Sequence, residues 1–172
     1  MAQLLDDLLD VARIMQDKIT LKMDCFDFAE IVDYVLETNC PLIEARKQQF
    51  VISRPKTPLW IKGDRVRLTQ VLSNLLNNAA KFTDEGGKIT LKLMQEAEQL
   101  LIKVQDTGVG ISTDMLPYIF DLFTQDAPSL ARSQGGLGIG LTLVRRLVEL
   151  HGGTISAASA GQKVASSPCA CH

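Results

Sequence analysis

The spacing of apolar residues divides the first part of the chain into helices and a strand. Over residues 3–17, leucine, alanine and methionine recur at helical spacing with aspartates between them, which predicts an amphipathic helix whose apolar stripe needs a partner helix. Residues 19–24 alternate between apolar and polar side chains and predict a strand. Asp27 and Glu30 form a capping box for a second helix, which we expect to be bent or interrupted at Pro41.

The middle of the chain contains two short strands, a long helix and a hairpin. Apolar runs at 50–53 and 59–62 predict the strands, and Asp64 is placed to cap the helix that follows. Residues 89–104 alternate twice around an Ala-Glu turn, which predicts a hairpin that delivers Asp106 at a strand end.

The last third contains a mixture of loops and regular elements. Residues 115–121 predict a short helix, and the polar stretch 124–134 contains a proline. A glycine-rich block then continues into an apolar helix that ends at His151, before a final strand at 154–159.

Composition narrows the class of protein. With 172 residues, 46% of them hydrophobic, the chain can bury one good core. A net charge of -2 with no basic stripe argues against nucleic-acid binding. No apolar run approaches the ~18 residues of a membrane span, and the N-terminus lacks the basic region of a leader, so we expect a soluble, cytoplasmic chain, from a full-length parent that can itself be membrane-associated.

The four cysteines lack the spacing of a disulfide framework, which favours a reduced compartment. The terminal Cys169-Ala170-Cys171-His172 has a metal-binding composition, but no fourth ligand is placed to complete a tetrahedron, and an incidental tail is the preferred interpretation.

Three short blocks carry the candidate chemistry, and the first is Asn74-Leu75-Leu76-Asn77-Asn78-Ala79-Ala80-Lys81-Phe82-Thr83. Asn74 and Asn78 are four residues apart on a helix, so their side chains share one face. An amide oxygen there can coordinate Mg²⁺, and Lys81 lies one turn further on, within reach of the same phosphates. The block alone is equally compatible with a polar, solvated helix face.

The second block is Asp106-Thr107-Gly108-Val109-Gly110-Ile111, directly after a strand. A carboxylate in a half-closed pocket can accept a hydrogen bond from the exocyclic amine of adenine, and Gly108 and Gly110 allow a flat base to approach the backbone. Taken alone, this block is as typical of a plain turn after a strand.

The third block is Gly135-Gly136-Leu137-Gly138-Ile139-Gly140-Leu141, at the start of an apolar helix. Free backbone N–H groups and the helix dipole make such a position an anion site suited to phosphates. No Gly-Lys-Ser/Thr follows, so the block is not a P-loop, and no strand directly precedes it as a dinucleotide fold requires.

The order of these blocks, with Phe120-Asp121-Leu122-Phe123 between the last two, resembles the N, G1, F and G2 boxes of sensor histidine kinases. These are ATP-binding domains of the GHKL superfamily, and the resemblance covers nearly everything from Leu4 to Ser159. It implies an α+β fold of the GHKL (Bergerat) type: a two-layer α/β sandwich whose mixed sheet is covered by helices, with an N-terminal helix from the dimerisation domain.

The same resemblance implies ATP and Mg²⁺ as ligands and assigns the metal contact to Asn78 and catalytic roles to Asn74 and Lys81. The residues 124–134 would be the lid over the nucleotide, where Arg132 is the remaining cation. The implied nucleotide-binding set is Asn74, Asn78, Lys81, Phe82, Asp106, Gly108, Gly110, Ile111, Gly136, Leu137, Gly138, Gly140 and Leu141.

The resemblance also divides the chain. Residues 1–18 would be the C-terminal part of the dimerisation hairpin, 19–162 the ATP-binding catalytic domain and 163–172 an atypical tail. The helix with the phosphoacceptor histidine is expected to be absent, so the partners implied are a phosphoacceptor helical domain, a response regulator receiver domain and a second copy in a full-length homodimer. His151 precedes two glycines at a helix end and is expected to cap that helix rather than accept a phosphoryl group.

Residue 74 separates transferase from hydrolase. Hydrolytic members of the superfamily carry a glutamate four residues before the metal-binding asparagine, where it activates water as a general base. An amide at Asn74 cannot take a proton, so a protein histidine kinase is favoured. A hydrolytic GHKL ATPase and a non-catalytic nucleotide-binding module are the alternatives.

The tail departs from the family pattern, which ends in a Gly-Ser-x-Phe strand followed by Leu-Pro. Residues 163–172 show no strand pattern. Permitted codons read from the third base of the Lys163 codon can encode Gly-Ser-Glu-Phe-Thr-Val-Arg-Leu-Pro, and we hypothesise a frameshift in the coding DNA that replaced the final strand. Such a frameshift would leave one edge of the sheet unpaired.

Overall fold

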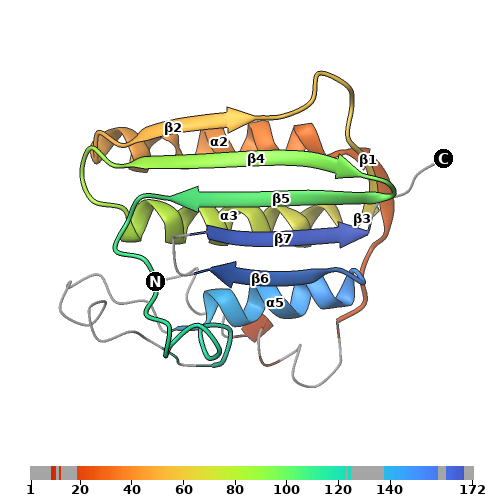
Figure 1. Ribbon diagram of the computed structural model, residues 1–172. Helices are drawn as coiled ribbons and strands as arrows, with labels where there is room; N and C mark the ends of the chain where they lie inside the picture. The colour runs from red at the N-terminus through yellow and green to blue at the C-terminus, as the bar shows by residue number, and fades with distance from the viewer. Residues whose placement is uncertain are drawn as a thin grey trace.

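The computed structural model describes residues 9, 10, 12, 19–122, 124 and 138–158, and the backbone of 162–168. Its main sheet has the strand order β2-β4-β5-β7-β6. Figure 1 shows the helices α2, α3 and α5 lying together on one face of this sheet, and none of the described helices covers the other face. The strands are β2 (Gln49–Ser53), β4 (Lys88–Glu96), β5 (Gln99–Asp106), β6 (Thr154–Ala158) and β7 (Gln162–Pro168).

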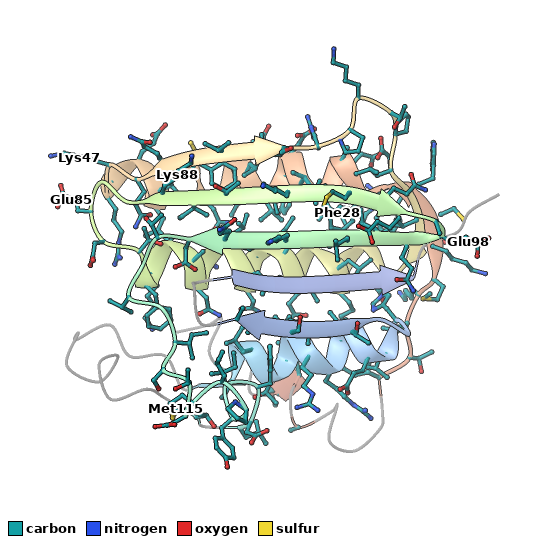
Figure 2. All side chains as sticks on the ribbon, in the orientation of Figure 1. Phe28, Lys47, Glu85, Lys88, Glu98 and Met115 are labelled. Carbon is teal, nitrogen blue, oxygen red and sulfur yellow. The ribbon has the colours of Figure 1, made fainter. Side chains whose placement is uncertain are left out.

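The sheet is mixed, because β2 pairs parallel to β4 whereas the other neighbours are antiparallel. The predicted hairpin is confirmed: β4 and β5 are joined by a tight turn at Ala97 and Glu98, with Ala97 at φ 52°. Figure 2 shows Glu98 at this turn, at one end of the sheet. Alternation along both strands puts one set of side chains in the core and the other on the open face.

Three helices cover the buried face of the sheet: α2 (Phe28–Ala45), α3 (Arg65–Phe82) and α5 (Gly140–Leu150). Phe28 at the start of α2 is completely buried behind the strands. Leucine, isoleucine and valine side chains from all three helices and from β4 and β5 form one core. Burial of this continuous apolar surface is what holds the two layers together.

The helix starts follow the predicted caps in part. Asp64 caps α3 as expected, accepting the backbone N–H of Arg67 at 3.1 Å. Asp27 caps α2 through Ala29 N–H, but the reciprocal half of the predicted box is wrong, because Glu30 pairs with Arg65 instead. Helix α2 also runs through Pro41 without interruption.

The position of Pro41 explains this continuity. Pro41 and Glu37, whose carbonyl the proline leaves without its helical donor, both lie on the exposed face of α2. Water can therefore take the place of the missing N–H donor.

A second, two-stranded sheet pairs β1 (Asp24–Asp27) with β3 (Trp60–Gly63) at the end of the domain where α2 begins. The predicted strand at 19–24 is therefore wrong for residues 19–23, which have no regular structure. A strand needs a neighbouring strand as well as alternating side chains, and no described strand pairs with residues 19–23. The backbone N–H of Lys22 instead donates to Asp64 Oδ2 at 2.9 Å.

Two further expectations are corrected in the C-terminal half. Residues 115–121 form successive turns and not the predicted helix. Residues 162–168 form β7 between β5 and β6, although the tail 163–172 shows no strand pattern in the sequence, so the expected unpaired edge does not occur at this position. Two neighbouring strands offer backbone hydrogen bonds on both sides, which compensates for the weak strand pattern of the sequence.

The two described cysteines are in different states. Cys25 is disulfide-bonded, contrary to the expectation of reduced cysteines, whereas Cys40 is free and exposed. Residues 9, 10 and 12 are helical, and most of the predicted helix at 3–17 lies outside the described residues, as does the terminal Cys-Ala-Cys-His tract. None of the described helices combines the length and the hydropathy that a bilayer span requires.

Candidate functional site

The first and third sequence blocks meet where α3 passes the start of α5. A Cβ added at Gly140 would lie 3.4 Å from Asn74 Oδ1 and 4.0 Å from Asn78 Nδ2. Both asparagines are half-buried, on the face of α3 that turns toward α5. The two amides and the first residue of α5 therefore border one small volume.

The second block meets α3 at its C-terminal end. Asp106 is the last residue of β5 and is only 9% exposed. Its Oδ1 accepts the backbone N–H of Gly108 at 3.0 Å, and Val109 N–H approaches the carbonyl of Phe82 at 3.4 Å. The loop after β5 thus lies directly against the last turn of the helix that carries Asn74 and Asn78.

Gly108 is required by this close approach. A Cβ at Gly108 would overlap the carbonyl oxygen of Phe82 and lie 2.9 Å from Asp106 Oδ1. Of the other glycines in the predicted set, Gly110 and Gly138 adopt positive φ angles of 70° and 69°.

Lys81 and Phe82 close the site at the end of α3. The ammonium of Lys81 lies 5.2 Å from the centre of the Phe82 ring. Partial burial, followed by the positive charge of Arg46, lowers the pKa of Lys81 from its ordinary value. An anion beside this ammonium would be attracted by the positive charges of both Lys81 and Arg46, and partial burial reduces the screening of that attraction by water.

The start of α5 offers donors for such an anion. Its N-cap residue, Ile139, has no side-chain oxygen with which to bond the first backbone N–H groups. The hydroxyl of Thr142, in the first turn, is buried without a hydrogen-bond partner among the described residues. Unpaired donors at a helix N-terminus are suited to phosphate oxygens.

The structure therefore brings together most of the predicted set. Asn74, Asn78, Lys81, Phe82, Asp106, Gly108 and Gly140 are joined by the contacts above, with Gly110 in the same loop, Ile111 half-buried just after it, and Gly138 and Leu141 flanking Gly140. Gly136, Leu137 and the predicted lid, including Arg132, lie outside the described residues apart from Thr124.

Two residues that sequence reasoning missed hold the end of α3. Arg46 Nη1 donates to the carbonyls of Ala80 and Lys81 at 3.1 and 3.0 Å. Gln48 Nε2 donates to Ala80 O at 2.9 Å and to Thr83 O at 2.8 Å. These contacts span more than thirty positions in the chain, so no local pattern signals them.

Comparison with known proteins identifies the family. The family model described as histidine kinase-, DNA gyrase B-, and HSP90-like ATPase matches residues 63–167, which include all three blocks. The chain belongs to this ATPase family. The ATP-binding domain that the sequence predicts is therefore present.

Relatives of this ATPase domain are sensor kinases. The sensor protein GacS of Pseudomonas syringae pv. syringae is 36% identical over 157 residues, which are 88% of this chain and 17% of that protein. The sensor histidine kinase RcsC of Escherichia coli is 35% identical over 156 residues, 90% of this chain and 16% of that protein. The chain thus spans about a sixth of the length of these curated relatives.

A solved structure gives the same result for the fold. Full-length ShkA in complex with AMPPNP superposes with a TM-score of 0.85 at 27% identity, covering 99% of this chain and 36% of that one. The predicted two-layer GHKL fold and the assignment to the ATP-binding domain of sensor histidine kinases are both confirmed.

Proposed function

We propose that this ATPase domain transfers the γ-phosphate of Mg-ATP to a histidine on a dimerisation domain. The observation that carries the proposal is the proximity of Gly140 to Asn74 and Asn78, which places the start of α5 beside the asparagine helix. The kinship with sensor histidine kinases supports the choice of histidine as acceptor.

Adenine would be held by Asp106. Its carboxylate is buried at the end of β5, and one of its oxygens, Oδ1, is fixed by Gly108 N–H. A buried carboxylate accepts a hydrogen bond from the exocyclic amine of adenine, whereas guanine presents a carbonyl there and is repelled. The glycine loop leaves the space that a flat base needs.

The triphosphate and the metal would lie between α3 and the start of α5. The donor set fits them: the first backbone N–H groups of α5, which have no side-chain cap, and the Thr142 hydroxyl, which has no partner among the described residues, suit phosphate oxygens. The Asn78 amide suits Mg²⁺, which prefers oxygen ligands. Bound Mg²⁺ would supply neutralisation of phosphate charge. Lys81 would add a second positive group beside the same phosphates.

Asn74 supports transfer over hydrolysis. Its side chain borders the site next to Gly140, but an amide cannot accept a proton from water. A hydrolytic ATPase is therefore the weaker alternative, and a non-catalytic nucleotide-binding module is the third.

The proposal extends to location and partners. Residues 1–18 would belong to the dimerisation hairpin of a homodimeric parent, and the domain would work in the cytoplasm. A response regulator receiver domain would take the phosphoryl group, as expected for relatives of sensor kinases.

The test is a titration with a fluorescent ATP analogue, with and without Mg²⁺, on the parent chain and on Asp106→Asn. Asparagine can still accept Gly108 N–H through its oxygen, so the loop is kept while the charge is lost. We expect affinity to fall about tenfold or more. Asp33→Asn, in an exposed ion pair with Arg54, is the matched control and should bind like the parent.

Two results would contradict the proposal. Unchanged affinity in Asp106→Asn would remove the adenine assignment. Rapid phosphate release by the parent chain, with no transfer to a phosphoacceptor helical domain added in trans, would favour the hydrolytic alternative.

A further inference from the structure

His151 is a buried titratable residue that the proposed chemistry does not use. It follows the last residue of α5 and is 5% exposed. Its Nδ1 lies 2.7 Å from Leu147 O, within its own helix, which confirms the expected capping role. Its Nε2 lies 3.0 Å from the backbone nitrogen of Asp64, which is 87 positions away in the sequence.

The two partners fix the state of the imidazole. A carbonyl can only accept, so Nδ1 must carry the proton, and a backbone N–H can only donate, so Nε2 must be bare. The tautomer with its proton on Nδ1 therefore satisfies both partners. Nδ1 bonds to a carbonyl at the end of its own helix, and Nε2 accepts a backbone N–H from a different helix.

That other element is the start of α3. Asp64 is the N-cap of α3, and both of its carboxylate oxygens are occupied, by Arg67 N–H and Lys22 N–H. A Cβ at Gly63 would lie 2.6 Å from Leu68 Cδ1 and 3.3 Å from His151 Cδ2, so the glycine leaves room for both side chains. The imidazole thus fastens the last turn of α5 to the first turn of α3.

The same two helices form the nucleotide site at their other contact. Asp64 precedes Asn74 by ten residues and Gly140 precedes His151 by eleven, so the two contacts are about 15 Å apart along each helix. The helices run antiparallel, with Gly140 against Asn74 at one contact and His151 against Asp64 at the other. Sliding or tilting of α5 must break one or the other.

We infer that His151 is a positioning residue for the nucleotide site: its Nε2 bond to Asp64 fixes the register of α5 on α3, and so the distance between the start of α5 and Asn74. This inference rests on the proposed nucleotide site. The capping bond to Leu147 has no such effect, because it lies within a single helix.

Two substitutions separate the two bonds. In His151→Gln the side-chain oxygen reaches the place of Nε2 and keeps the bond from Asp64 N–H. In His151→Asn the amide reaches the place of Nδ1 and keeps the cap but loses the bond between helices. We expect Asn to weaken binding of a fluorescent ATP analogue about tenfold and Gln to retain most of the affinity.

Affinities are compared well below the melting temperature of each variant, with circular dichroism as a check on folding. Equal affinity in all three proteins, or a greater loss in Gln than in Asn, would overturn the inference. Absence of binding by the parent chain would refute the proposed function itself, so the two failures are distinguishable.

A measurement on the parent chain keeps the inference testable if the Asn variant does not fold. Because coupling between two sites is reciprocal, nucleotide binding must stabilise the joint as much as the joint strengthens binding. We expect hydrogen exchange at the Asp64 amide to slow about tenfold with the Mg-ATP analogue. An unchanged rate at this amide, remote from the phosphates, would contradict the positioning role.

Discussion

The backbone of Gly108 rests on the carbonyl group of Phe82, so closely that a Cβ at position 108 would overlap that oxygen. This contact joins the loop after β5 to the last turn of α3. It fixes where Asp106 is presented relative to the asparagines of the site.

Gly108→Ala should therefore damage both fold and site. The added methyl must push the loop away from Phe82, at an overpacking cost of about 1–3 kcal/mol, and should lower affinity for an ATP analogue about tenfold. Thermal unfolding and calorimetric titration check the two effects. A variant with the melting temperature and affinity of the parent would show that the loop is not held as described.

Gly140→Ala should separate stability from binding. The new Cβ makes ordinary contacts, 3.4 Å from Asn74 Oδ1, and alanine at a helix position is favoured over glycine by up to about 1 kcal/mol. The melting temperature should therefore be equal or higher. Affinity for the Mg-ATP analogue should fall, because the methyl occupies space between α5 and the amides; unchanged affinity would place the phosphates elsewhere.

Lys81 should show a pH dependence with a definite sign. Burial, then Arg46, lowers its pKa from 10.5, so over the window between its folded pKa and 10.5 the unfolded chain holds more protons and stability rises with pH. Below that window the charged group weakens the fold. Lys81→Met should thus melt slightly higher than the parent at pH about 7, with a difference that shrinks toward pH about 10.5.

The same Lys81→Met variant should bind the ATP analogue more weakly, since a phosphate partner is lost. Lys47→Met is the control, because Lys47 is an exposed lysine paired with Glu85 at the sheet end seen in Figure 2. A gain in melting temperature that is constant across the pH range would indicate added apolar packing in place of a desolvated charge.

Asp10 should stabilise the fold through its contacts with α3. Its Oδ2 accepts Arg67 Nη1 at 2.7 Å and Gln70 Nε2 at 3.1 Å, and the paired side chains of Arg67 and Asp10 are only 22% and 15% exposed. Asp10→Asn should cost about 1–2 kcal/mol of unfolding free energy and speed hydrogen exchange around residue 10.

The matched control for Asp10 is the exposed pair of Glu30 with Arg65, where the side chains are 56% and 50% exposed. Glu30→Gln should change the unfolding free energy by less than about 0.5 kcal/mol. Equal effects of the two substitutions would mean that the contact of Asp10 contributes no more than an ordinary surface pair.

The residues encoded by the alternative reading frame should make the C-terminal strand more stable than the present tail does. The positions of β7 opposite the buried residues Leu100, Ile102 and Val104 are Ser167, Ala165 and Lys163, of which one is apolar. Replacing residues 164–172 by Gly-Ser-Glu-Phe-Thr-Val-Arg-Leu-Pro puts phenylalanine in place of Ser167, opposite the buried Leu100, and should raise the melting temperature by about 4 °C or more. Sequencing of the coding DNA tests the frameshift directly, and a lower melting temperature would argue that β7 is adapted as it stands.

Local patterns determined much of this protein. The cap at Asp64, the hairpin that ends at Asp106 and the family of the three blocks follow from alternation, turn residues and spacing, because these signals act between residues a few positions apart. A local pattern gave a wrong prediction where a tertiary contact competed with it. Glu30 has the spacing of a capping box, but it pairs with Arg65 on another helix.

Tertiary structure alone decided which side chains meet. Four relationships in the structure join residues that are far apart in the chain. They are the proximity of Gly140 to Asn74, the hydrogen bonds of Arg46 to the end of α3, the bond of His151 to Asp64, and the pairing of β7 between β5 and β6. Such partners are chosen by the packing of whole elements around one core, and a single hydrogen bond contributes too little to leave a trace in local composition. The sequence therefore specified the groups of the site, and the packing of α3, α5 and the sheet specified their geometry.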